Sequence, residues 1–230
     1  MGIKERQERD REAVRRSILD AARELFVAEG FQNVSIRKIA ERIEYSPAAI
    51  YGYFPSKDDI FFALAEEGFR LLDDPRTVGD DPRFKDAAPL ERIRAVFWRL
   101  YEFSRDQPQY FALMFVDRSV PRINREYERF AFAREGKQHI IEEVQSCMDA
   151  GALPKGLNPA VAMRALMVGV LGVAVLRLSD RLGPGEDADL LAADVLNLTI
   201  AGLRSDVALQ SSGLVECPLE IQPVADAQAS

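Results

Sequence analysis

Two short amphipathic segments, separated by only a few residues, constrain the fold of this chain more than any other feature. Ser35 precedes the first, which runs to Ile43 with isoleucines on its inner face. Ser46 and Pro47 open the second, which ends near Phe54. Serine caps a helix N-terminus, and proline needs no N–H partner at the first helical position. Short helices joined by a tight turn can place one helix in the DNA major groove, so the pattern predicts a helix-turn-helix unit.

Helical periodicity continues through the remainder of the chain. No run alternates apolar and polar residues for long enough to predict a β-strand. The sequence therefore predicts an all-α fold of about nine helices, with an N-terminal three-helix helix-turn-helix domain (1–56), a larger helical bundle (57–206) and a disordered tail (207–230). The expected helices run from about Val14 to Gly30, then over 35–43, 46–54, 57–72, 90–105, 108–116, 121–150, 159–181 and 187–204, with a loop at 73–89.

The two ends of the first helix carry separate expectations. Gly30 is expected at its C-terminal end in the left-handed conformation that glycine adopts without strain. The segment Lys4–Arg16 alternates positive and negative side chains, which predicts a solvated or frayed start of the helix. Tracking of the DNA minor groove is the alternative for this segment.

Net charge argues against a protein that coats nucleic acid without specificity. The chain of 230 residues carries a net charge of −7, whereas residues 1–60 hold 11 basic and 11 acidic side chains. All of the excess negative charge therefore lies in the bundle and tail. Such a distribution holds an acidic body away from DNA while a neutral tip approaches it.

Few residues suit metal binding, disulfides or membrane insertion. Cys147, Cys217 and His139 are too scattered for a zinc site or a disulfide framework, so no metal or cofactor is expected. The N-terminus is charged and has no apolar core of a signal peptide, which favours a cytoplasmic protein. The apolar run Ala165–Leu176 has 12 residues, against the ~20 that a spanning helix needs, so no membrane partner is expected.

Three segments of the N-terminal domain resemble the tetracycline-repressor (TetR) family. They are Ile18–Phe31, Val34–Ile43 and Ser46–Lys57, and the last contains the specific signature Tyr51-x-Tyr53-Phe-x-Ser-Lys57. The resemblance covers roughly residues 14–65 and leaves the remainder of the chain uncovered.

The resemblance implies a set of DNA contacts at the matching positions. Serine, tyrosine and lysine side chains would hold phosphates, which sets register without reading sequence. Arg37 would reach a guanine in the groove, although it could instead be a solvated surface arginine. The start of the second helix is apolar and offers contacts such as one to a thymine methyl group. The implied DNA-binding residues are Ser35, Arg37, Lys38, Ser46, Pro47, Ala48, Ala49, Tyr51, Tyr53 and Lys57.

Glu44 departs from the family pattern. It occupies the turn position at which the family usually has glycine. A left-handed conformation costs a residue with a side chain on the order of 1 kcal/mol, so we expect a distorted turn. A carboxylate at this position also faces DNA phosphate unfavourably.

Aromatic and methionine side chains are dense in the middle of the bundle. Resemblance to the family implies an apolar ligand pocket there, although residues of this kind at helical spacing are, taken singly, more often ordinary core. Arg94, Arg118 or Asn124 could add polar contacts, and Phe103, Phe130 and Phe132 add to the aromatic density. The expected ligand-binding residues are Phe97, Trp98, Tyr101, Tyr110, Phe111, Met114, Phe115, Met163 and Met167.

Stripes of small and apolar residues on the two C-terminal helices, expected over 159–181 and 187–204, suggest contact between subunits. Small residues at helical spacing allow another helix to approach closely, and two such helices per subunit can form the four-helix interface that the family uses. Packing within one chain is the alternative. The expected interface residues are Ala165, Gly169, Gly172, Leu176, Leu191, Val195 and Leu198.

The sequence thus predicts a homodimeric transcriptional regulator with double-stranded DNA as its partner, and favours a repressor. A small apolar or aromatic effector would tilt the fourth helix and release a palindromic operator. An α-helical enzyme fits poorly, because the chain offers no nucleophile–base spacing, phosphate loop or metal cluster, and no catalytic residue is assigned. A small-molecule-binding protein that has lost DNA recognition is the remaining alternative.

Overall fold

The computed structural model describes residues 2–72, 84, 86–121, 131–205, 209 and 211. This part of the chain contains nine α-helices and no strand, which confirms the predicted all-α class. Two further helical turns, η1 (Phe31–Asn33) and η2 (Ala112–Val116), connect them. The α-helices are α1 (Ile3–Glu29), α2 (Ile36–Arg42), α3 (Pro47–Tyr51), α4 (Lys57–Leu72), α5 (Pro89–Asp106), α6 (Pro108–Phe111), α7 (Ala131–Asp149), α8 (Pro159–Leu178) and α9 (Ala188–Arg204).

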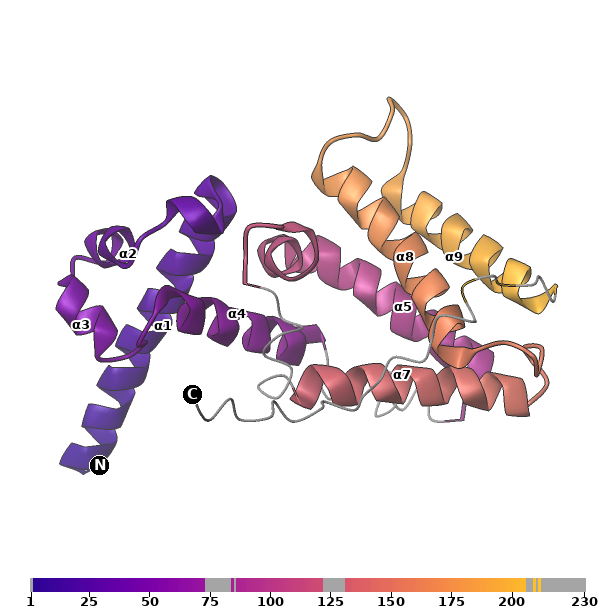
Figure 1. Ribbon diagram of the computed structural model, residues 1–230, viewed down its shortest axis with the longest axis horizontal. Coiled ribbons are helices and arrows are strands. Elements are labelled where there is room, and N and C mark those ends of the chain that lie inside the picture. Colours follow the sequence, from indigo (N-terminus) through magenta and orange to yellow (C-terminus); the bar gives the residue numbers. More distant parts are fainter. Residues whose placement is uncertain are drawn as a thin grey trace, which may run out of the picture.

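The helices form two groups that α4 connects. Figure 1 shows α1, α2 and α3 together at one end and α5, α7, α8 and α9 stacked at the other, with α4 leading from the first group to the second. The small group packs around Ile18 and Phe26 of α1, Ile39 of α2 and Ile50 of α3, all of which are buried. Because α4 buries Ile60, Phe61 and Leu64 in the same continuous core, the two groups share one apolar interior.

The longest apolar helix, α8, lies in the middle of the bundle. It has 20 residues and could cross a membrane by length and composition alone. The helix is longer than the uninterrupted apolar run Ala165–Leu176, because Arg164 and Arg177 lie within it. The helix packs on α5, α7 and α9 of the bundle. Partial burial on these neighbours accounts for its composition without a membrane.

Several predicted helix ends were wrong by a few residues. The second helix of the turn unit is shorter than expected, because Gly52 follows Tyr51 and ends it. The segment expected as one helix over 108–116 divides into α6 and the π-helical η2. Helix α8 ends at Leu178, two residues before Asp180, which has a φ of 50°. Pro121, the expected start of the following long helix, is not helical. Residues 122–130 lie outside the described residues, as do the loop at 73–83 and most of 207–230.

Gly30 differs from the expected left-handed helix end in one backbone angle. Its φ is 82°, as expected, but its ψ is 144°, which places it in a region that only glycine populates readily. Its N–H still donates to the carbonyl of Phe26 at 2.9 Å, so the helix end is capped. The chain can then turn directly into η1.

Candidate nucleic-acid interface

Serine caps define both helices of the turn unit. The hydroxyl of Ser35 accepts a hydrogen bond from the Lys38 amide at 3.2 Å, and that of Ser46 accepts one from the Ala49 amide at 3.2 Å. Each bond satisfies one of the amides that a helix start leaves without a partner. The remaining amides carry partial positive charge and point out of the helix start, which suits a phosphate group.

The turn between α2 and α3 is regular in spite of Glu44. This residue has a φ of 59°, the left-handed value expected at a glycine position. The next amide, of Tyr45, donates to the carbonyl of Ala40 at 2.9 Å and closes the end of α2. The expected distortion is therefore absent, and the strain is confined to one backbone position.

The outer surface of α3 is apolar. Pro47 and Ala48 are exposed and Ala49 is half-buried, whereas Ile50 is completely buried beneath them. The buried isoleucine fixes the helix against α1 and α2, and the small outer residues allow a close approach of the backbone to another surface. These positions can contact a thymine methyl group but donate no side-chain hydrogen bond to a base.

Arg37 and Lys38 of α2 have different surroundings. The guanidinium of Arg37 is 80% exposed, and its Nε lies 2.8 Å from a carboxylate oxygen of Glu41. This hydrogen bond raises the pKa of Arg37, so the charge is permanent. Lys38 instead forms an ion pair with Glu29 at the end of α1. Arg37 can rotate toward DNA at the loss of one exposed ion pair, whereas Lys38 also fixes α2 to α1.

Tyr51 and Tyr53 lie at the far end of α3. The side chain of Tyr51 is 55% exposed, and that of Tyr53 is half-buried. The guanidinium of Arg11 lies over the Tyr53 ring, 5.8 Å from its centroid. Phosphate contacts of these two tyrosines remain a prediction, and Arg11 is a cation beside Tyr53 that was not among the implied DNA-binding residues.

Lys57 has a structural role that sequence reasoning missed. Its ammonium group donates to the carbonyls of Phe31 and Val34 at 2.7 and 2.9 Å, and lies 4.1 Å from the centroid of the Phe31 ring. Two of its three hydrogens are therefore used inside the protein, which joins the start of α4 to the segment before α2. Contact of Lys57 with a phosphate remains a prediction.

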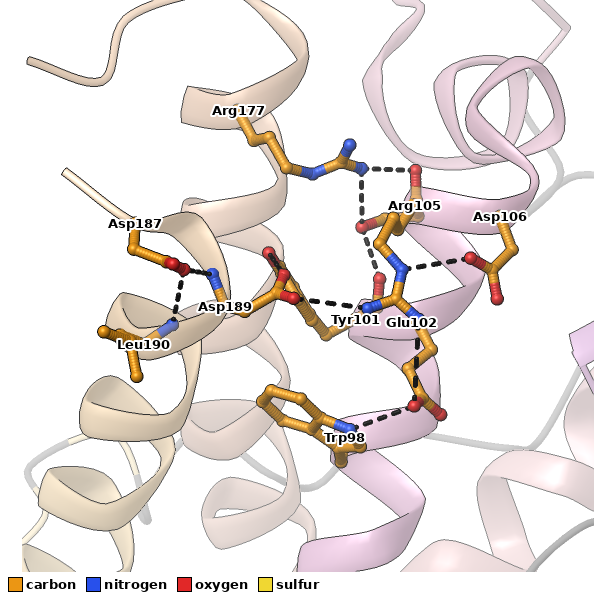
Figure 2. A network of polar contacts seen from close by, with 10 residues as sticks. Trp98, Tyr101, Glu102, Arg105, Asp106, Arg177, Asp187, Asp189 and Leu190 are labelled. Atoms are coloured by element: carbon orange, nitrogen blue, oxygen red, sulfur yellow. Dashed lines mark hydrogen bonds and ion pairs between the residues drawn. The ribbon is translucent and has the colours of Figure 1, made fainter. Parts of the chain in front are cut away.

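The expected ligand-binding residues all belong to one apolar core or pack against it, but they lie at different places along it. Tyr110, Phe111, Met114 and Phe115 lie on α6 and η2, and a Cβ atom at Gly68 of α4 would be 2.3 Å from the Met114 sulfur. Trp98 and Tyr101 instead lie on the C-terminal half of α5, near the start of α9 (Figure 2). Phe97 is buried between the helices.

Met163 and Met167 are distant from the Tyr101 group. Arg177, near the end of α8, lies over the Tyr101 ring, and Met163 is 14 residues earlier on the same straight helix, which corresponds to about 21 Å. Arg94 donates to Asn197 of α9, and Arg118 is exposed. Asn124 and Phe130 lie outside the described residues, as does the side chain of Phe132. A pocket that includes all of the expected residues remains a prediction.

A polar network fixes the ends of three bundle helices (Figure 2). The hydroxyl of Tyr101 donates to Asp189 of α9 at 2.6 Å, and Arg105 reaches the second oxygen of the same carboxylate at 3.3 Å. Arg177 of α8 donates to the Ser104 carbonyl at 2.6 Å. Burial and the Asp189 contact raise the pKa of Tyr101 to about 12. The network has no recognisable sequence signal, because its partners are 73 to 88 residues apart.

Two family models match the chain and cover both groups of helices. The model of bacterial regulatory proteins of the tetR family matches residues 18–64, and the tetracyclin repressor-like C-terminal domain matches residues 93–198. The nucleoid occlusion factor SlmA of Vibrio campbellii is 34% identical over an aligned length of 149, and the match covers 56% of this chain and 74% of that protein. This chain belongs to the tetR family. The predicted functional class, a DNA-binding transcriptional regulator, is thereby confirmed at the level of the family.

Two further tetR-like relatives extend the comparison. An HTH-type transcriptional repressor of Mycobacterium tuberculosis is 44% identical over 55 residues, which are only 24% of this chain and 29% of that protein. The crystal structure of the transcriptional regulator FadR from Bacillus subtilis, in complex with stearoyl-CoA, superimposes with a TM-score of 0.66 at 18% identity. It covers 81% of this chain and 97% of that one, and it establishes the likeness of fold.

The stripes expected at a tetR-family dimer interface have two different surroundings in this chain. Gly169 packs within the subunit, because a Cβ atom there would be 2.8 Å from a methyl group of Val195. Ala165, Leu191 and Val195 are half-buried. Around Gly172 there is open space, and Leu176 and Leu198 are 37% and 71% exposed. Sequence reasoning missed Val168 and Leu190, which are 57% and 67% exposed on the same two helices.

The described residues contain no group of three or more histidine, cysteine, aspartate or glutamate side chains that could hold a metal ion. Cys147 is completely buried in the bundle, and burial raises the pKa of its thiol to about 11. A thiol in these surroundings is uncharged at neutral pH and behaves as a small apolar core residue.

Proposed function

We propose that this chain is a homodimeric repressor that a small apolar effector releases from a palindromic operator. The observation that carries the proposal is the α2–α3 unit, in which capped helix starts and the exposed side chains of Arg37 and Tyr51 lie on the surface. These features supply phosphate contacts, one candidate base contact and an apolar helix that fits closely in the major groove. Such a protein acts on DNA in the cytoplasm and needs no catalytic residue.

The exposed apolar face of α8 and α9 supports the dimer. Val168, Gly172 and Leu176 lie along α8, and Leu190 and Leu198 lie along α9. Burial of each exposed leucine by a second copy would contribute up to about 1.5–3 kcal/mol. The dimer has a mechanical purpose, because it must place two α3 helices about 34–36 Å apart to enter successive major grooves.

The region around α6 and η2 supports a site for the effector. Met114 and Phe115 are half-buried there, and methionine and aromatic side chains adapt readily to apolar ligands. FadR from Bacillus subtilis, which shares the fold, was crystallised with stearoyl-CoA. An apolar or aromatic molecule that enters beside α6 would separate it from α4. Release of DNA then requires that the effector binds more tightly to the separated state, and its influence cannot exceed that difference in affinity.

Mobility-shift assays with the DNA that flanks the encoding gene test the proposal. We expect tight, salt-sensitive binding to a palindromic site and much weaker binding to random duplexes. Arg37→Ala should reduce discrimination at one base position by about 1–3 kcal/mol. Arg70→Ala is the matched control, because Arg70 is 69% exposed and pairs with Glu66 on α4 at the same spacing.

Two results would count against this interpretation. Equal binding of wild type to random and flanking DNA would support the alternative protein that has lost DNA recognition, which the apolar surface of α3 makes reasonable. Equal weakening of all sequences by Arg37→Ala would make Arg37 a phosphate contact and leave base reading to DNA shape.

Sedimentation analysis tests the dimer separately. Leu198→Glu places a charge on the most exposed leucine of α9 and should convert a dimer to a folded monomer with unchanged helical content. Leu71→Glu is the control, because Leu71 is 41% exposed but lies on α4. A Leu198→Glu protein that remains dimeric would place the interface elsewhere.

A further inference from the structure

The first third of α1 extends beyond the small group of helices. The helix has 27 residues, and residues 4–13 are exposed on every side, whereas burial begins around Val14 and is complete at Ile18. Figure 1 shows this part of α1 continuing past α3 with no other element beside its N-terminal turns. The N–H of Gly2 donates to Glu5 at 3.0 Å, which caps the helix start. We refer to residues 3–13 as the α1 extension.

A groove lies where the α1 extension leaves the fold. Its volume is about 490 Å³, and it is open to solvent. One wall is α1 and the other is the segment directly after α3. Because Tyr53 is an expected phosphate contact, the groove continues the proposed DNA surface. Its lining residues are Gln7, Asp10, Arg11, Val14, Gly52 and Tyr53.

Three cations share the face of α1 that turns toward this groove. Successive residues of a helix are about 100° apart, so Lys4, Arg11 and Arg15 fall within about 40° of one another. The guanidinium of Arg11 stacks on Tyr53, and that of Arg15 lies over the Phe54 ring, 5.5 Å from its centroid. Stacking holds both cations beside the end of α3. Arg15 also donates a hydrogen bond to Glu12 at 3.4 Å, so Arg11 is the better placed of the two for a new contact.

We propose that the α1 extension is a second DNA-binding element, which grips the phosphate backbone beside each half-site. This inference rests on the proposed function and names an additional part of its DNA surface. Arg11 is the central contact, because it lines the groove and is positioned by Tyr53. From Ile3 to Arg11 the extension spans about 12 Å, which is the axial length of about three to four base pairs.

Charge distinguishes a backbone contact from insertion in the minor groove. Glu8 and Asp10 accompany the cations on the extension, and Asp10 lines the groove. The minor groove carries a strongly negative potential, which favours arginine and opposes carboxylates between the strands. Contact with the backbone from outside the DNA duplex lets Arg11 face a phosphate while the acidic side chains stay in solvent. Asp10→Asn should therefore strengthen binding by removing one repulsion in each subunit.

A salt series with three proteins tests the inference. In Arg11→Gln, the dimer loses two phosphate contacts, and the slope of log K against log salt should decrease in magnitude by about 1.8. Arg9→Gln removes the same charge from a position about 160° away around the helix and should leave the slope at the wild-type value. Both side chains are exposed, so we expect both variants to fold. Thermal unfolding checks this.

Duplex length gives a second measurement. Wild type should bind an operator with about four extra base pairs on each side several-fold more tightly than one trimmed to its half-sites. Arg11→Gln should show no such preference.

The possible outcomes separate this inference from the proposed function. Equal slopes for Arg11→Gln and wild type, or an equal loss in Arg11→Gln and Arg9→Gln, would overturn the role of the α1 extension while operator binding stands. Failure of wild type to prefer any operator would overturn both.

Discussion

The guanidinium of Arg23, in α1, donates a hydrogen bond to the hydroxyl of Tyr110, in α6, at 2.8 Å and lies over the same ring at 4.9 Å. Arg23 also donates to Gln109 at 2.9 Å. In this way one side chain of the DNA-reading group (α1, α2 and α3) contacts α6, the part of the bundle that is expected to respond to the effector. Nearby, Arg16 of α1 pairs with Glu67 of α4, so the same face of α1 contacts both elements.

The Arg23–Tyr110 contact should be worth measurable stability. In a double-mutant cycle of Arg23→Met and Tyr110→Phe, we expect a coupling of about 1–2 kcal/mol in the free energy of unfolding. Urea denaturation of the four proteins measures it. Additive effects of the two substitutions would mean that the Arg23–Tyr110 contact contributes nothing and that the Arg23–Gln109 bond and apolar packing join α1 to α6.

Gly68 lets α4 and η2 approach each other closely. A Cβ atom at this position would lie 2.3 Å from the sulfur of Met114 and 3.2 Å from the ring of Tyr110. Although alanine favours a helix by about 1 kcal/mol, the clash should make Gly68→Ala destabilising by about 1–2 kcal/mol in net terms. The double variant Gly68→Ala/Met114→Ala should be less destabilised than the sum of its parts. A Gly68→Ala protein as stable as wild type would show that Met114 moves aside freely.

Glu44 offers a route to a more stable protein. Glycine at φ 59° removes the left-handed strain, so Glu44→Gly should raise the free energy of unfolding by up to about 1 kcal/mol. Glu44→Ala keeps the strain and should give no such gain. Both variants lose a carboxylate beside the DNA surface and should bind operator more tightly. Thermal unfolding and shift assays measure the two effects separately, and equal stabilities of the glycine and alanine variants would refute the strain.

Tyr101 makes the bundle sensitive to alkaline pH. Its pKa in the folded state is about 12, raised by burial and by Asp189, whereas an unfolded tyrosine titrates near 10. The folded state therefore keeps the proton to higher pH, and stability is lost as pH rises from about 10 to about 12, by roughly 2 kcal/mol. Tyr101→Phe should lack this loss. Tyr45→Phe is the control, because Tyr45 is 44% exposed. Its free energy of unfolding, measured with urea at a series of pH values, should fall with pH as that of wild type does.

Local features of the DNA-reading group could be predicted from the sequence, because they depend on residues a few positions apart. Ser35 and Ser46 act within one helical turn, and the family resemblance implied the left-handed position of Glu44, where the family usually has glycine. The partners of Lys57 could not be predicted, since they are backbone carbonyls 23 and 26 residues away and carry no side-chain signal.

The bundle was harder to predict than the DNA-reading group. The period of an apolar stripe shows that a helix face is buried but does not identify the neighbouring helix. Trp98 and Met114 both follow helical spacing, yet they face different helices. Gly169 and Gly172 belong to one stripe, and only the structure separates the inward position from the outward one. The π-helical turn after α6 also escaped prediction, because a change from four to five residues per hydrogen bond leaves no clear pattern.

The bonds of Lys57 make α4 act as a lever. Because its ammonium group is bonded to the carbonyls of both Phe31 and Val34, the first turn of α4 and the approach to α2 move as one body. The helix has 16 residues and is about 24 Å long. A rotation of about 5° at its bundle end would carry Lys57 and the attached reading head by about 2 Å, which is enough to break hydrogen bonds to DNA that require about 2.7–3.2 Å. In the proposed mechanism, a small displacement beside Gly68 would thus be amplified into loss of register on the operator.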